Sequence, residues 1–194
     1  MATRERTRTK LLDAADHLLF TRGIAATPVD AILARAGASP ATLYRAYGSK
    51  EALVAAALER RHAAWLEVWD AAVAAAPDDR GRLLAVLDAL ETFRARPDGA
   101  RWCAFLGTAA EAVDPPAELA TALARDTTSL TERLGAFAEP VTGRADVAAD
   151  LAADLLLVVT GHLAMHLRDA ADPAATRRVA ETLVDAHTGR TARP

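Results

Sequence analysis

The chain has 194 residues, 52% of them hydrophobic and 25% charged, so it can bury a full core in one or two domains. Its single cysteine, Cys103, excludes an internal disulfide and gives no sign of an oxidising compartment. No apolar segment of a signal peptide follows the basic N-terminus, and the most apolar run, 155–159, is far shorter than the ~20 residues of a membrane-spanning helix. We therefore expect a soluble cytoplasmic protein with no membrane partner.

The sequence predicts an all-α fold of about nine helices, because no segment shows sustained β-branched alternation or a hairpin turn. Proline, glycine and aspartate separate the helical segments. The predicted helices cover residues 4–22, 28–36, 40–46, 49–75, 80–95, 99–112, 116–138, 145–169 and 173–187. We divide the chain into an N-terminal domain, 1–48, and a C-terminal helical domain, 49–194.

Residues 27–51 are the most informative part of the chain. Thr27 is a candidate N-cap for the second helix, and Gly37 ends that helix. Ser39 caps a very short third helix, which Gly48 terminates. Two short helices joined by a tight turn that contains glycine form a helix-turn-helix, whose second helix enters the major groove of DNA.

This stretch resembles the DNA-binding motif of the TetR family of bacterial transcriptional regulators. The match is dense over residues 8–54 and rests on Gly23, Thr27, Val29, Ile32, Ala36–Gly37, Ser39, Thr42–Leu43–Tyr44, Tyr47 and Ser49–Lys50–Glu51–Ala52–Leu53. The resemblance implies a DNA-binding domain followed by a helical domain for ligand binding and dimerisation. It also implies a homodimeric regulator, in most cases a repressor, that binds a palindromic operator in double-stranded DNA and is released by a small hydrophobic effector.

The distribution of charge agrees with a DNA-binding N-terminus, although the net charge of −3 alone does not. Residues 1–50 hold eight basic and four acidic side chains, whereas the rest of the chain holds 15 basic and 22 acidic ones. Chance clustering in a chain rich in arginine and aspartate is the alternative explanation. Arg4, Arg6 and Arg8 either lie along DNA phosphates or belong to a solvated disordered tail.

The third helix has about two turns, so few of its side chains can reach base edges. Thr42 can hydrogen-bond a base or phosphate, Tyr44 has reach and a hydroxyl, and Arg45 can bind guanine or phosphate. The resemblance adds Pro40 and Ala41 as usual contacts, and Lys50 as a contact to the DNA backbone. The residues predicted to bind DNA are Thr27, Ser39, Pro40, Ala41, Thr42, Tyr44, Arg45 and Lys50.

The segment 145–169 is apolar on more than one face and must be buried against its own chain and a partner. With 173–187 it would form a four-helix interface of a two-fold homodimer. We expect Leu155 and Val158 to face the partner chain.

Aromatic side chains in the C-terminal domain predict an apolar ligand site, although filling of the core explains any one of them equally well. No arginine cluster suits a phosphate, so the expected effector is largely apolar, neutral or weakly charged. The residues predicted to bind it are Trp65, Trp69, Phe93, Trp102, Phe105 and His162.

His162, His166 and Asp169 share one helical face at a spacing that could hold a metal. We favour polar groups of a pocket wall or interface instead, and predict no metal and no cofactor. The three serines lie outside any nucleophile elbow, so we predict no enzymatic activity. A rival hypothesis is a helical small-molecule-binding protein or enzyme with a non-functional DNA-binding head; the apolar Ala46 favours it.

Overall fold

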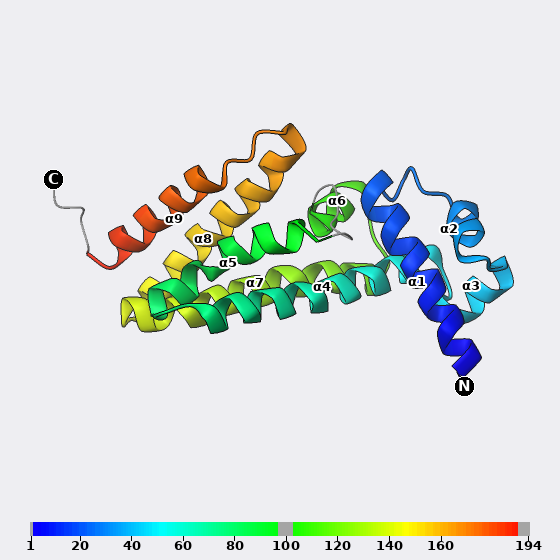
Figure 1. Cartoon of the computed structure of the whole chain (residues 1–194), viewed down its shortest axis with the longest axis horizontal. Coiled ribbons are helices and arrows are strands. Elements are labelled where there is room, and N and C mark those ends of the chain that lie inside the picture. The colour runs from blue at the N-terminus through cyan, green and yellow to red at the C-terminus, as the bar shows by residue number, and fades with distance from the viewer. Residues whose placement is uncertain (1, 97–102, 190–194) are drawn as a thin grey trace. The chain divides into compact units, whose positions relative to one another are not determined.

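The structure is a computed structural model that describes residues 2–96 and 103–189. Within these ranges the chain forms nine α-helices, one short 3-10 helix and no strand (Figure 1), which confirms the all-α prediction. The elements are α1 (Ala2–Arg22), α2 (Val29–Ala36), α3 (Pro40–Tyr47), α4 (Lys50–Ala75), α5 (Asp79–Arg94), α6 (Ala104–Glu111), α7 (Ala117–Thr142), α8 (Ala145–Met165), η1 (His166–Arg168) and α9 (Pro173–His187).

The chain divides into two compact units, each with its own hydrophobic core. The first unit comprises Met1–Ala63 and Ala100–Asp126, and the second comprises Ala64–Gly99 and Thr127–Pro194. The first core includes Leu11, Phe20, Ile32, Leu43, Leu58, Leu119 and Ala122. The second core includes Trp69, Leu83, Leu134, Leu151, Leu155 and Val184. Both α4 and α7 supply residues to the two units.

The helix-turn-helix forms as the local sequence predicts, with one correction. Ser39 caps α3 by accepting a hydrogen bond from the Thr42 amide, and Gly37 closes α2 with a left-handed φ of 62°. The prediction that Thr27 caps α2 is wrong, since Pro28 occupies that position and no side chain caps the helix. The Thr27 hydroxyl instead hydrogen-bonds to the backbone carbonyls of Leu18 and Gly23.

The helix α7 runs further than expected, because it passes through Pro140 instead of ending before it. Proline there removes a single backbone hydrogen bond in the last turn of the helix, a smaller loss than in its middle. The helix ends instead before Gly143, which has a φ of 67° and donates its amide proton to Glu139.

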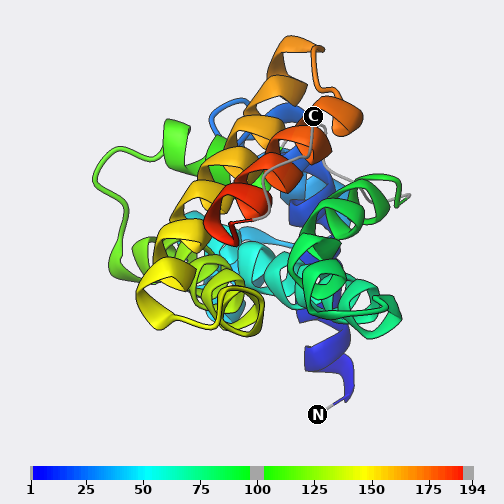
Figure 2. The ribbon, with the colours of Figure 1, turned by 90° about the vertical axis from the view of Figure 1, so that its left-hand side faces the viewer.

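In the second unit α9 packs against α8 and α5, and α8 and α9 lie side by side (Figure 2). The structure corrects the sequence analysis on which residues of α8 face outward. Leu155 is only 1% exposed and belongs to the core of its own unit, whereas Leu157 is 72% exposed. Hydrophobicity along α8 does not separate the two, because Leu155, Leu156 and Leu157 are the same residue type.

Length and composition alone make Ala145–Arg168 long and apolar enough to cross a membrane. The uninterrupted apolar run 155–159 is too short to indicate this property, which belongs to the helix as a whole. The core helix of a soluble protein passes the same test, and Leu151, Leu155 and Val159 of this helix do lie in the core of the second unit.

Candidate functional site

The helix α3 presents an exposed face in the first unit. Pro40, Ala41, Tyr44 and Arg45 are exposed, and 55% of Tyr44 is accessible, which is unusual for so large a side chain. On the opposite face Leu43 is fully buried in the first core. The face therefore consists of the residues for which the sequence predicts DNA contacts.

Contacts with α1 hold α3 in place. The Arg8 guanidinium donates a hydrogen bond to the Ala46 carbonyl at 2.6 Å and lies 4.6 Å from the centre of the Tyr47 ring. The Tyr47 hydroxyl in turn donates to the Arg8 carbonyl at 3.0 Å. Burial raises the pKa of Tyr47, so its hydroxyl remains protonated and able to donate. Arg8 is thus a helical residue fixed on α3 and does not belong to a disordered tail.

Two further predicted DNA-binding residues, Thr27 and Lys50, make contacts around the loop between α1 and α2. Thr27 is only 1% exposed, and its hydroxyl donates to the Gly23 carbonyl at 2.7 Å. The Lys50 ammonium donates to the Ile24 carbonyl at 2.8 Å, which leaves two of its three protons for other acceptors. Glu111 accepts a hydrogen bond from the Ala25 amide at 2.5 Å. No local sequence signal predicts the Glu111 contact, because Ala25 and Glu111 lie 86 positions apart.

The predicted ligand-binding aromatic residues do not form one group. Trp65, Trp69 and Phe93 cluster in the second unit, where the Trp65 ring centre lies 5.5 Å from that of Trp69 and 5.8 Å from that of Phe93. Phe105 belongs to the first unit and forms a T-shaped ring pair with His62. Trp102 lies outside the described residues. Both Trp65 and Trp69 are buried in the second core, so packing accounts for their position.

The sixth predicted ligand residue, His162, lines a pocket of about 250 Å³ in the second unit, formed by α5, α8 and α9. The pocket walls include Leu87, Glu91, Pro173 and Thr176. His162 bonds to Glu91 through Nε2 and to Thr176 through Nδ1, at 2.9 Å each.

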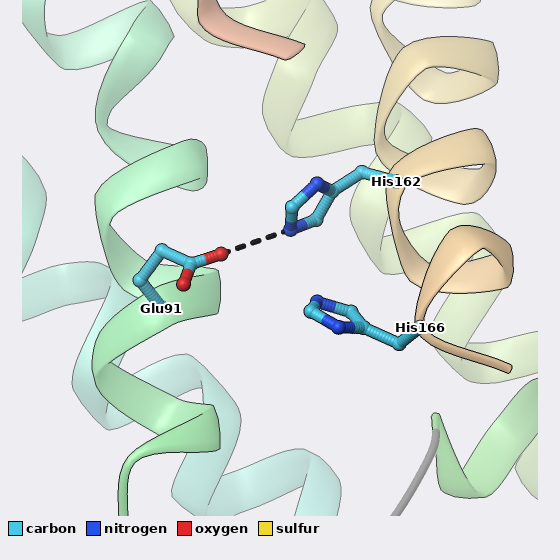
Figure 3. A group of neighbouring side chains, drawn as sticks. All are labelled: Glu91, His162 and His166. Carbon is cyan, nitrogen blue, oxygen red and sulfur yellow. Dashed lines mark hydrogen bonds and ion pairs between the residues drawn. The ribbon is translucent and has the colours of Figure 1, made fainter. Parts of the chain in front are cut away.

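The rings of His166 and His162 form a T-shaped pair, with 4.9 Å between the ring centres. Burial lowers the pKa of His166, and the charge of Arg94 and the neighbouring His162 add to this effect. The carboxylate beside the two histidines belongs to Glu91 (Figure 3), whereas Asp169 is exposed and terminates η1 with a φ of 51°.

Comparison with known proteins agrees with these observations. Residues 11–57 match the family of bacterial regulatory proteins named after tetR. A TetR-family transcriptional regulator from Streptomyces coelicolor is 25% identical over 96% of this chain and 94% of that one, with a TM-score of 0.76. A TetR-type regulator from Streptomyces avermitilis is 29% identical over 93% and 97%, with a TM-score of 0.77.

A TetR-family regulator from Cytophaga hutchinsonii, 21% identical over 100% and 99% of the two chains, shares the fold at a TM-score of 0.78. The comparison with curated proteins gives no match. The segment matched by the family model contains α2, α3 and most of α1.

The contacts of Arg8 predict that Arg8→Ala destabilises the first unit. Loss of a charge-assisted hydrogen bond and of a cation–π contact should lower the free energy of unfolding by about 1–3 kcal/mol. Chemical denaturation at one fixed protein concentration measures this change. The control is Arg6→Ala, an exposed position on the same helix, which should change the value by less than about 0.5 kcal/mol. Equal effects of the two substitutions would show that Arg8 does not anchor α3.

Proposed function

We propose that this chain, which belongs to the TetR family of bacterial transcriptional regulators, is a repressor. It would act in the cytoplasm, by binding DNA and an effector, and would catalyse no reaction. A homodimer would bind a palindromic operator through α3 of each protomer and leave it when a small hydrophobic effector binds. Residues 1–48 would carry DNA binding, and residues 49–194 effector binding and dimerisation. The observation that carries the proposal is the exposed face of α3, on a helix that Leu43 and Arg8 fix to the first unit.

DNA binding is assigned to the face of α3 and the residues next to it. The N-terminal end of α3 is free to enter a groove, with Ser39 and Thr42 hydroxyls beside the exposed Tyr44 and Arg45. Lys50 would reach a phosphate with its remaining protons. We leave Thr27 out of the contact set, since its hydroxyl is buried and bonded within the first unit.

The DNA-binding proposal predicts distinct effects for two substitutions. Tyr44→Ala should weaken binding to the operator by about 1–3 kcal/mol while changing binding to random DNA little, because Tyr44 would contact base edges. Lys50→Ala should weaken both about equally, because a phosphate contact carries no sequence information. Fluorescence anisotropy with a selected palindrome of roughly 15–30 base pairs and a scrambled duplex measures both effects.

The charge control for these variants is Arg144→Ala, an exposed arginine of the second unit that pairs with Asp146. It should leave both affinities unchanged. If Tyr44→Ala and Lys50→Ala alter operator and scrambled DNA in the same ratio, the roles assigned to them are wrong.

Dimerisation is assigned to the exposed faces of α8 and α9. The exposed apolar residues there are Leu157, Met165 and Val179, with Leu167 just beyond α8. Gly161 lies on the same face of α8 as Leu157 and Met165, one turn from each, and a Cβ at this position would point into open space. Such a small-residue position allows the backbone of a partner helix to approach closely.

The interface proposal predicts that Leu157→Asp gives a folded monomer that no longer binds the operator, because a charge at the centre of an apolar contact is costly. The matched control is Val113→Asp, an exposed apolar residue in the loop between α6 and α7, which should remain dimeric. Light scattering gives the mass and circular dichroism the helix content. A dimeric Leu157→Asp variant with normal DNA binding would place the interface elsewhere.

Effector binding is assigned to the second unit, where the aromatic cluster Trp65, Trp69 and Phe93 lies. A largely apolar molecule packed against these rings would bind more tightly to the conformation that cannot bind DNA. By linkage, bound DNA would lower the affinity for the effector by the same factor as the effector lowers the affinity for DNA. The cluster is buried, so the effector would enter by displacing side chains such as the half-buried Phe93.

The effector proposal predicts that hydrophobic, drug-like compounds quench the intrinsic fluorescence and release the operator. Phe93→Leu should weaken this response. The control is Phe137→Leu, which should preserve the response. Phe137 is also half-buried and lies next to Trp69, but it is not among the residues predicted to bind the effector. Titrations that follow fluorescence and DNA release together measure both. Release of DNA by a phosphorylated metabolite, with no response to hydrophobic compounds, would refute the proposal.

A further inference from the structure

Three side chains that can ligate a metal converge in the second unit between α5 and α8. Glu91 comes from α5, His162 from α8 and His166 from η1, and one ligand atom from each lies within 4.8 Å of the others (Figure 3). The histidines are four residues apart, at the end of α8 and the start of η1, and their rings lie side by side. The carboxylate comes from a position 71 residues before His162 in the sequence, and folding brings it opposite the two rings.

We propose that Glu91, His162 and His166 bind a divalent transition metal ion of the Zn²⁺ class. Two imidazoles and one carboxylate are a ligand set that such ions favour, and three protein ligands leave a fourth position open. Bonds of ~2.0–2.1 Å in a tetrahedron separate neighbouring ligand atoms by about 3.3 Å. The distance from His162 Nε2 to the Glu91 carboxylate is 2.9 Å, and the whole set spans 4.8 Å, so small side-chain rotations can reach this geometry.

The surroundings of His162 suit a metal ligand. Its Nδ1 lies 2.9 Å from the Thr176 hydroxyl, which itself lies 2.9 Å from the Asp172 carbonyl. If the hydroxyl donates its one proton to that carbonyl, it accepts from Nδ1–H, and the Nε2 lone pair is left free to face Glu91. Two acceptors 2.9 Å apart need a cation or a proton between them. A metal ion would meet this need, with Thr176 orienting the ligand from outside the coordination shell.

The alternative arrangement has no metal. The Thr176 hydroxyl then donates to Nδ1, and Nε2–H donates to Glu91 as an ordinary hydrogen bond. This arrangement gives His166 no part, although its ring is within reach of the same carboxylate. The two arrangements therefore differ in their dependence on His166, which an experiment can measure.

Access and local charge also bear on the site. The His162 side chain is only 3% exposed, whereas that of Glu91 is 43% exposed, so an ion would enter from the side of the carboxylate. Glu91 and His162 line the 250 Å³ pocket, which gives the open coordination position room for water or another ligand. Among the described residues, Arg94 and Arg177 are cations near the site, and Asp88 neutralises Arg177 by pairing with it.

The test is titration of the full-length, chelator-treated protein with Co²⁺, whose visible absorption reports tetrahedral coordination, followed by displacement with Zn²⁺. The wild type should bind one ion per chain. His166→Ala and Glu91→Gln should each bind about 10-fold more weakly or worse. The matched control is His187→Ala, which removes another histidine of the second unit, bonded to Asp154, and should bind as the wild type does.

Thr176→Val tests the outer contact separately, and should weaken Co²⁺ binding about 10–100-fold while the fold is kept. Circular dichroism checks the folding of every variant, and Glu91→Gln serves if His166→Ala does not fold. Absence of stoichiometric binding in the wild type would overturn the proposal. So would equal loss of binding in His166→Ala and His187→Ala. Because DNA binding is not a readout, failure here would leave the proposed regulatory function untouched.

Discussion

The helix α3 has eight residues, and a helix of that length is not stable by itself in water. Its position depends on what it packs against and on what holds its ends. Leu43 buries one face in the first core, Ser39 caps the N-terminal end, and Arg8 bonds to the last turn. Because these contacts all use the inner face or the ends, the outer face is free for base edges and phosphates. Exposure of Tyr44 and Arg45 is thus a consequence of how the helix is fixed.

A second group of contacts fixes the segment between α1 and α2. The carbonyls of Gly23 and Ile24 accept from Thr27 and Lys50, and the Ala25 amide donates to Glu111. Residues that sequence reasoning assigned to DNA therefore also satisfy backbone groups inside the first unit. For Lys50 the two roles are compatible, since an ammonium has three protons.

Much of the fold followed from local sequence signals. Helix periodicity, the Ser39 cap and the Gly37 turn depend on residues within one or two turns of each other, and the structure confirms them. Features that depend on distant residues could not be predicted. The Glu91 carboxylate beside His162 and the Glu111 contact to Ala25 arise only after folding. The outward position of Leu157 also depends on which neighbours cover α8, and three consecutive leucines give no local signal for it.

The first unit is built from two stretches of chain that the segment 64–99 separates. Ala104, Leu119 and Ala122 complete a core whose other members all precede residue 59. During synthesis from the N-terminus, the helix-turn-helix therefore emerges well before the residues that cover its supporting helices. Until residue 122 has left the ribosome, part of the apolar surface of α1 and α4 lacks its native cover. A fragment cut after α4 would share this defect, because the compact unit that contains the helix-turn-helix is discontinuous in sequence.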